Sequence, residues 1–89
     1  MTKKKQYKVV ATQHGKVVFS LHVEKFTTAN VVVKNWCAKA MKENEDLMFS
    51  IYDENGVEIA NGDFWAGDNF YYYYDFRDNE PYTVKMLIA

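Results

Sequence analysis

The stretch YKVVATQHGKVVFSLHV, residues 7–23, decides the fold because apolar and polar side chains alternate on both sides of Gln13-His14-Gly15. Alternation around a glycine-containing turn predicts a β-hairpin. A two-residue His14-Gly15 loop would mix apolar and polar side chains on each face, whereas a three-residue loop separates them. We therefore expect the three-residue loop, a type I turn followed by a left-handed glycine and a bulge. Its apolar face would hold Tyr7, Val9, Ala11, Val17, Phe19, Leu21 and Val23, and its opposite face Lys8, Val10, Thr12, Val18, Ser20 and His22.

A single amphipathic helix is expected directly after this hairpin. Thr27 is suited to the N-cap, with Phe26 and Val31 forming a hydrophobic staple across the first turn. The helix should end near Asn44, after lysines that favour the negative end of its dipole. One apolar stripe repeats with helical spacing and should face the sheet. This stripe comprises Ala29, Val33, Trp36, Cys37, Ala40 and Met41.

Two further hairpins are predicted in the second half of the chain. Asp53-Glu54-Asn55-Gly56 favours a type I turn, and a three-residue loop separates apolar from polar residues between Leu47 and Ala60. The last hairpin pairs 70–76 with 82–88, with Phe76 opposite Tyr82 and Pro81 just before the strand. Residues 61–69 fit a short strand or a loop equally well. The expected inner faces are Leu47, Phe49, Ile51, Val57 and Ile59 in one hairpin, and Phe70, Tyr72, Tyr74, Phe76, Tyr82, Val84, Met86 and Ile88 in the other.

These elements predict an α+β fold, with an antiparallel sheet of about six strands and one helix packed on one face. The order is three hairpins, ββα-ββ-ββ, in one domain spanning 1–89, of which residues 1–5 are expected to be a disordered basic tail. No stretch is apolar enough to span a membrane. The lone Cys37 excludes an intramolecular disulfide and fits a cytoplasmic protein.

The charges are segregated along the chain. Residues 1–42 hold nine lysines and one acid, Glu24, whereas residues 43–89 hold eleven acids against Arg77 and Lys85. The net charges of the two parts are therefore +8 and −9. The two parts either neutralise one another in the fold or give the surface one basic and one acidic side.

No residue pattern predicts catalysis or metal binding. Asp53–Gly56 differs from a calcium loop because its glycine comes too early. The two histidines and Cys37 lack the spacing of zinc ligands, and Cys37 fits the apolar stripe of the helix. The acids lie in turns, where solvated carboxylates are common. We therefore expect a protein that is not an enzyme and that uses neither a metal nor a cofactor.

The segment 63–75 is the most distinctive part of the sequence, with seven aromatic residues among thirteen. Alternation is expected to bury Phe70, Tyr72 and Tyr74 under the helix and to leave Tyr71 and Tyr73 on the uncovered face. Exposed tyrosine and tryptophan often dominate protein interfaces. We therefore expect a non-enzymatic module that binds a protein partner, or itself as a homodimer. The expected anchors are Trp65, Tyr71 and Tyr73, and the residues setting specificity are Asp63, Asp68 and Asp75.

A second hypothesis links the protein to nucleic acid. Lysines of the basic part could bind phosphates, namely Lys8, Lys16, Lys34 and Lys39. Alternatively, the acidic, tyrosine-rich part could imitate a nucleic-acid strand and occupy a basic groove on another protein. The short length and the Lys-, Asn- and Tyr-rich composition suit a phage or mobile-element protein, such as an accessory or inhibitor protein.

Overall fold

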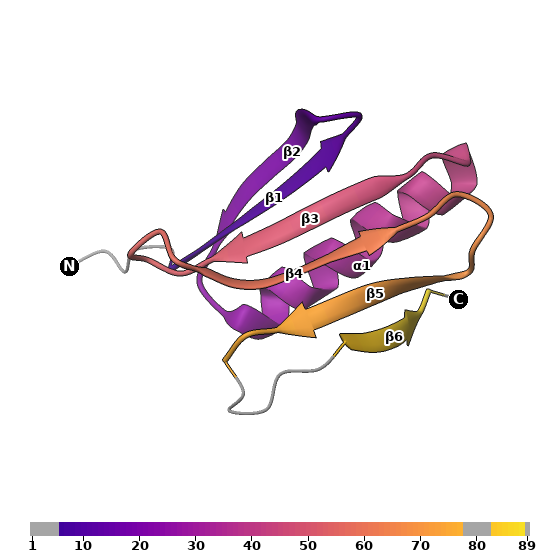
Figure 1. Cartoon of the computed structure of the whole chain (residues 1–89). Helices are drawn as coiled ribbons and strands as arrows, with labels where there is room; N and C mark the ends of the chain where they lie inside the picture. Colours follow the sequence, from indigo (N-terminus) through magenta and orange to yellow (C-terminus); the bar gives the residue numbers. More distant parts are fainter. Residues whose placement is uncertain (1–5, 78–82, 89) are drawn as a thin grey trace.

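Six antiparallel strands form one open sheet in the order β2-β1-β3-β4-β5-β6, and one helix packs on one face (Figure 1). The predicted α+β class and element order are confirmed. This computed structural model describes residues 6–77 and 83–88. The predicted tail 1–5, and the predicted pairing through Pro81 and Tyr82, lie outside the described residues. The elements are β1 (Tyr7–Gln13), β2 (Lys16–Val23), α1 (Phe26–Glu43), β3 (Leu47–Tyr52), β4 (Glu58–Phe64), β5 (Phe70–Asp75) and β6 (Thr83–Leu87).

The β1–β2 hairpin places most of its apolar residues on one face as predicted, but its turn and its register differ from the prediction. His14 and Gly15 both have positive φ, 53° and 79°, as a two-residue type I′ turn requires. A bulge then shifts the register, so that Val17 lies opposite Thr12 and does not join the apolar face. The predicted three-residue loop is therefore wrong, and the bulge keeps apolar residues opposite one another despite the two-residue loop. The pairs formed are Tyr7–Val23, Val9–Leu21 and Ala11–Phe19.

The helix has the predicted stripe and end, but its start is different. It begins at Phe26, and Lys25 occupies the N-cap position without a side-chain hydrogen bond. Val31 is 58% exposed, so no hydrophobic staple forms. The start is stabilised by tertiary packing, because the Phe26 ring lies edge-on to Tyr7 with centroids 5.8 Å apart. The helix ends as expected at Asn44, whose φ of 56° lies in the left-handed region common at helix ends.

The β3–β4 hairpin confirms the three-residue loop and resolves the ambiguous stretch. The Gly56 amide donates to the Asp53 carbonyl at 3.0 Å, closing the turn. A bulge beside Ile51 then places Ala60 opposite it, so β4 buries Ala60 and Phe64, while Val57 is exposed. Residues 61–64 thus belong to the strand, and 65–69 form the connection to β5.

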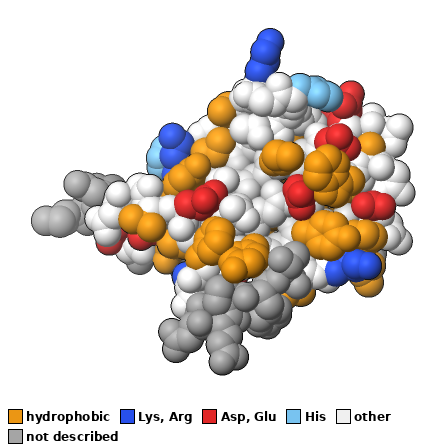
Figure 2. Space-filling model, in the orientation of Figure 1, with side chains coloured by type: hydrophobic (Ala, Val, Ile, Leu, Met, Phe, Trp, Pro, Cys, Tyr) orange, Lys and Arg blue, Asp and Glu red, His pale blue; other side chains and the backbone are white. Residues whose placement is uncertain are grey.

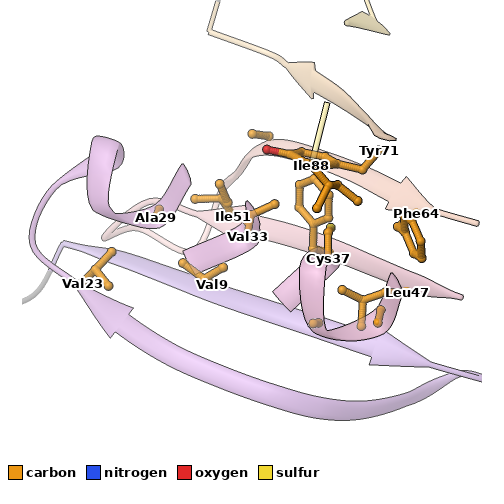
Figure 3. Close-up of a cluster of buried hydrophobic side chains, with 14 residues drawn as sticks. Val9, Val23, Ala29, Val33, Cys37, Leu47, Ile51, Phe64, Tyr71 and Ile88 are labelled. Atoms are coloured by element: carbon orange, nitrogen blue, oxygen red, sulfur yellow. The ribbon is translucent and has the colours of Figure 1, made fainter. Parts of the chain in front are cut away.

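The hydrophobic core lies between α1 and one face of the sheet (Figure 3). The helix packs chiefly on β1 and β3. Gly62 in β4 leaves room for the Phe49 ring, since a Cβ built there would overlap that ring and the Tyr72 carbonyl. The opposite face of the sheet carries no helix in the described part of the chain, and we call it the open face. The buried core residues are Val9, Ala11, Val23, Ala29, Val33, Cys37, Ala40, Leu47, Phe49, Ile51, Ala60, Phe64, Tyr71 and Ile88.

Candidate functional site

The two faces of β5 are the reverse of those predicted. Tyr71 is only 3% exposed, and its ring meets Phe49 edge-on at 5.8 Å between centroids. Tyr73 is half-buried on the same face, and its hydroxyl donates a 2.6 Å hydrogen bond to Asn30 Oδ1 on the helix. Both tyrosines therefore belong to the helix-covered side of the sheet. The prediction that they are surface anchors on the uncovered face is wrong.

The reversal has a physical cause in the sequence of β5. Five consecutive aromatic residues, 70–74, give alternation no polar partner, so either face could have been the buried one. The register between β4 and β5 determines which face of β5 is buried, because Gly62 pairs with Tyr73 and Asp63 pairs with Tyr72. The small Gly62 faces the core and the charged Asp63 faces outward. Paired residues lie on the same face, so Tyr73 lies on the core side and Tyr72 lies on the open side. On β6, Leu87 lies opposite Phe70, one residue earlier than the expected Ile88.

The burial of Tyr71 and Tyr73 affects their ionisation and that of the neighbouring thiol. Desolvation raises the pKa of Tyr71 to about 12, with a smaller contribution from Cys37. Desolvation likewise raises the pKa of Tyr73. Cys37 is completely buried and unpaired, and burial raises its pKa to about 12, assisted by Asp63. All three groups are therefore neutral over the physiological range.

The open face carries a row of four aromatic rings instead. Phe70, Tyr72 and Tyr74 alternate along β5, and Phe76 follows directly after the strand. The rings form two close pairs, with 5.3 Å between the centroids of Phe70 and Tyr72 and 4.6 Å between those of Tyr74 and Phe76. At one end, Leu87 lies opposite Phe70 and is 64% exposed. We call Phe70, Tyr72, Tyr74 and Phe76 the open-face aromatic row.

Charged and amide groups flank this row on both sides. Tyr72 lies between Asp63 on β4 and Lys85 on β6, and the Lys85 ammonium is 4.3 Å from the centroid of the Phe70 ring. Tyr74 lies opposite Asn61. A small hollow of about 160 Å³ forms among these β4 and β5 side chains. The row therefore combines apolar rings with an anion, a cation and a hydrogen-bonding amide, as protein interfaces commonly do.

The open face continues beyond the row to a broad hollow. A line of paired positions runs from Tyr74 through Asn61 and Ser50 to Val10, across four strands. Val10 lines a hollow of about 770 Å³ between the sheet and the β3–β4 turn. Figure 2 shows apolar side chains distributed over this face with acidic groups between them and most Lys and Arg side chains toward the margins. Other residues lining the hollow include Gln6, Tyr7, Lys8, His22, Tyr52 and Asp53.

Trp65 lies at the end of the sheet, where β4 leads into the turn before β5. It is 42% exposed and lines an apolar hollow of about 210 Å³ with Leu47 and Met48. The turn is closed by a 3.1 Å hydrogen bond from Asp68 N–H to the Trp65 carbonyl, and Ala66 N–H donates a 2.7 Å hydrogen bond to Asp46 Oδ1. Trp65 is therefore an accessible aromatic side chain, and its binding role remains a prediction.

The three predicted specificity carboxylates occupy different environments. Asp63 lies on the open face beside Tyr72, and Asp68 lies in the turn that follows β4. Asp75 instead accepts hydrogen bonds from Arg77 at 3.0 and 3.1 Å, and the Arg77 guanidinium lies 3.5 Å from the Phe26 ring centroid. The side-chain hydrogen bond from Arg77 lowers the pKa of Asp75. Asp75 therefore holds the end of β5 against the helix start and does not form one acidic cluster with Asp63.

The four lysines proposed for phosphate binding do not share one surface. Lys8 lies on the open face opposite Tyr52, whereas Lys34 and Lys39 are exposed on the helix, on the other side of the sheet. Lys16 starts β2 at the hairpin turn. Lys39 also forms a 3.2 Å ion pair with Glu43. The described structure therefore gives no continuous basic track.

Sequence reasoning missed Phe70, Tyr72, Tyr74 and Phe76 as surface groups. The signal that could have found them lies in the neighbouring strand, where Asn61 and Asp63 alternate with small and apolar residues. Among residues 6–77 and 83–88, no three His, Cys, Asp or Glu side chains gather closely enough to hold a metal ion.

Comparisons with protein-family profiles, curated protein sequences and solved structures found no significant match to this chain. The fold itself defines the class: an α+β domain whose antiparallel sheet is covered by one helix on one face and is open on the other. In the part of the chain that the structure describes, no helix has the length and apolar character needed to cross a membrane.

Proposed function

We propose that the protein is a non-enzymatic interaction domain that binds a protein partner through the open-face aromatic row. The observation that carries this proposal is the row itself, four aromatic rings on a sheet face that α1 does not cover. Aromatic residues supply large contact areas at low entropic cost and dominate the binding energy of many interfaces.

The charges around the row favour a protein over nucleic acid. A phosphate backbone requires a track of cationic side chains. Here Asp63 flanks Tyr72 directly, and the two described lysines of this face, Lys8 and Lys85, are on strands far apart in the sheet. The pattern instead suits a partner with an apolar patch flanked by a basic group opposite Asp63 and an acidic group opposite Lys85.

The test replaces two central rings of the row and compares binding with a matched control. The variant carries Tyr72→Ser and Tyr74→Ser, and the control carries Val31→Ser, an exposed apolar position on the outer side of the helix. Proteins captured from the native host lysate by the wild-type chain are purified and titrated calorimetrically against all three. We expect the affinity to fall by about 100-fold or more in the double variant, because hot-spot residues each contribute about 2 kcal/mol or more. The control should bind like the wild type.

Two results would refute the proposal. One is a partner that binds the double variant as tightly as the wild type while circular dichroism shows both to be folded. The other is tight binding to single-stranded DNA or RNA with a steep dependence on salt, since that would indicate phosphate recognition.

A further inference from the structure

We propose that two copies of this chain associate through their β2 strands, forming one continuous antiparallel sheet. The inference goes beyond the open-face binding proposed above and uses a different surface. In the described structure β2 is an edge strand, with β1 on one side and no further strand on the other. The backbone groups on an edge can pair with another strand.

Lys16 and the bulge at Val18 protect the start of β2, but residues 19–23 lack the features that normally prevent such pairing. Natural edge strands are commonly short, or carry lysine or proline along their length. Residues 17–23, VVFSLHV, contain no Lys, Arg, Asp, Glu or Pro. Val17 is 63% exposed and Leu21 is 42% exposed. The strand at the other edge, β6, has five residues with Lys85 in the middle, so it is both short and protected by a lysine.

The partner is a second copy because the regular part of β2 is complementary to itself. Residues 19–23, FSLHV, alternate apolar and polar side chains symmetrically about Leu21. Antiparallel pairing on a two-fold axis at Leu21 joins apolar to apolar residues and polar to polar residues. On the helix side, Phe19 then faces Val23 of the partner subunit. On the open side, the hydroxyl of Ser20 faces the imidazole of the partner's His22.

The bulge in β2 and the chain beyond Val23 restrict the register. The pairing between β1 and β2 is regular over residues 19–23 and shifts beyond Phe19, where Val17 lies opposite Thr12. An axis at Phe19 or Ser20 would bring the bulged residue Val18 into the new ladder. An axis at Leu21 keeps the five-residue ladder free of the bulge. On the helix side, the Trp36 ring stacks on Phe19 with centroids 5.2 Å apart and extends the apolar surface beside β2.

Sedimentation equilibrium tests the assembly directly. The wild-type chain should have twice its 10.4 kDa mass at submillimolar concentration. Leu21→Lys places like charges opposite one another at the axis and should raise the dissociation constant of the dimer by about tenfold or more. Val57→Lys, a comparably exposed position on the β3–β4 hairpin, should leave it unchanged. A monomeric wild type, or equal effects of the two variants, would overturn the proposal.

Cross-linking supplies a second measurement that does not depend on the stability of a lysine variant. In a Cys37→Ala background, Leu21→Cys should form a disulfide-linked dimer on mild oxidation, because antiparallel partners lie within disulfide reach. Val57→Cys serves as the exposed control and should remain monomeric on a non-reducing gel. Equal cross-linking of the two cysteines would contradict the register. Neither the mass of the dimer nor the Leu21→Cys cross-link depends on partner binding at the open face. The proposed dimer and the proposed partner binding can therefore be refuted separately.

Discussion

The clearest test of the β5 faces compares two adjacent tyrosines. Tyr71→Ala removes a ring that is 3% exposed and packs edge-on against Phe49. Truncation of a buried aromatic residue costs about 3–5 kcal/mol. Tyr72→Ala removes a half-buried ring of the open face and should cost about 1 kcal/mol, chiefly its contact with Phe70. The difference between the two variants should therefore be about 2–4 kcal/mol.

Urea unfolding followed by far-UV circular dichroism measures this difference. The total free energy of unfolding of a domain is roughly 5–15 kcal/mol, so Tyr71→Ala should remove a large part of it. Its melting temperature should fall by about 12 °C or more, since each kcal/mol shifts a domain of this size by about 4–8 °C. Equal midpoint shifts for Tyr71→Ala and Tyr72→Ala, with unchanged m-values, would refute the assignment of faces.

Three further predictions concern the packing beneath the sheet. Gly62→Ala should destabilise the protein by about 1–3 kcal/mol, because the added Cβ overlaps a facing ring and a backbone carbonyl; thermal unfolding checks this. Tyr73→Phe should cost about 0.5–1.5 kcal/mol by removing the hydrogen bond to Asn30, and Asn30→Ala in the Tyr73→Phe background should add little more in a double-mutant cycle. Burial raises the pKa of Cys37 and of Tyr71 to about 12, above their unfolded values, so stability is fully retained below about pH 8.5 and is lost as the pH rises toward 12. Urea titrations between pH 8 and 11 should show this decline, and it should be shallower in Tyr71→Phe.

Strong patterns in the sequence predicted most of the architecture. Alternation around Gln13-His14-Gly15 identified the first hairpin, although not its loop length, and helical spacing identified the stripe that includes Val33 and Cys37. The start of the helix was missed because Phe26 is held by the Tyr7 ring and the Arg77 guanidinium, which come from distant parts of the chain. Such tertiary contacts override local capping preferences.

The candidate site was harder to predict, because its position depends on pairing between strands. Within 70–74 every residue is aromatic, so local alternation defines two faces without saying which is buried. The bulge beside Ile51 then shifts β4 by one residue, and a shift of one residue exchanges the faces. Gly62 identifies the buried face of β4, since the absence of a side chain there leaves room for the Phe49 ring.

The strand order also has a consequence for the kinetics of folding. Among the described strands, β1 and β3 are the one neighbouring pair that is not consecutive in the chain, and their ladder joins positions such as Val9 and Ile51 across the whole helix. Every other ladder is a hairpin that closes a short loop. Contacts distant in sequence carry the largest loop-closure cost and tend to limit the folding rate. Substitutions at the β1–β3 seam should therefore slow folding, whereas substitutions in β6 should mainly accelerate unfolding.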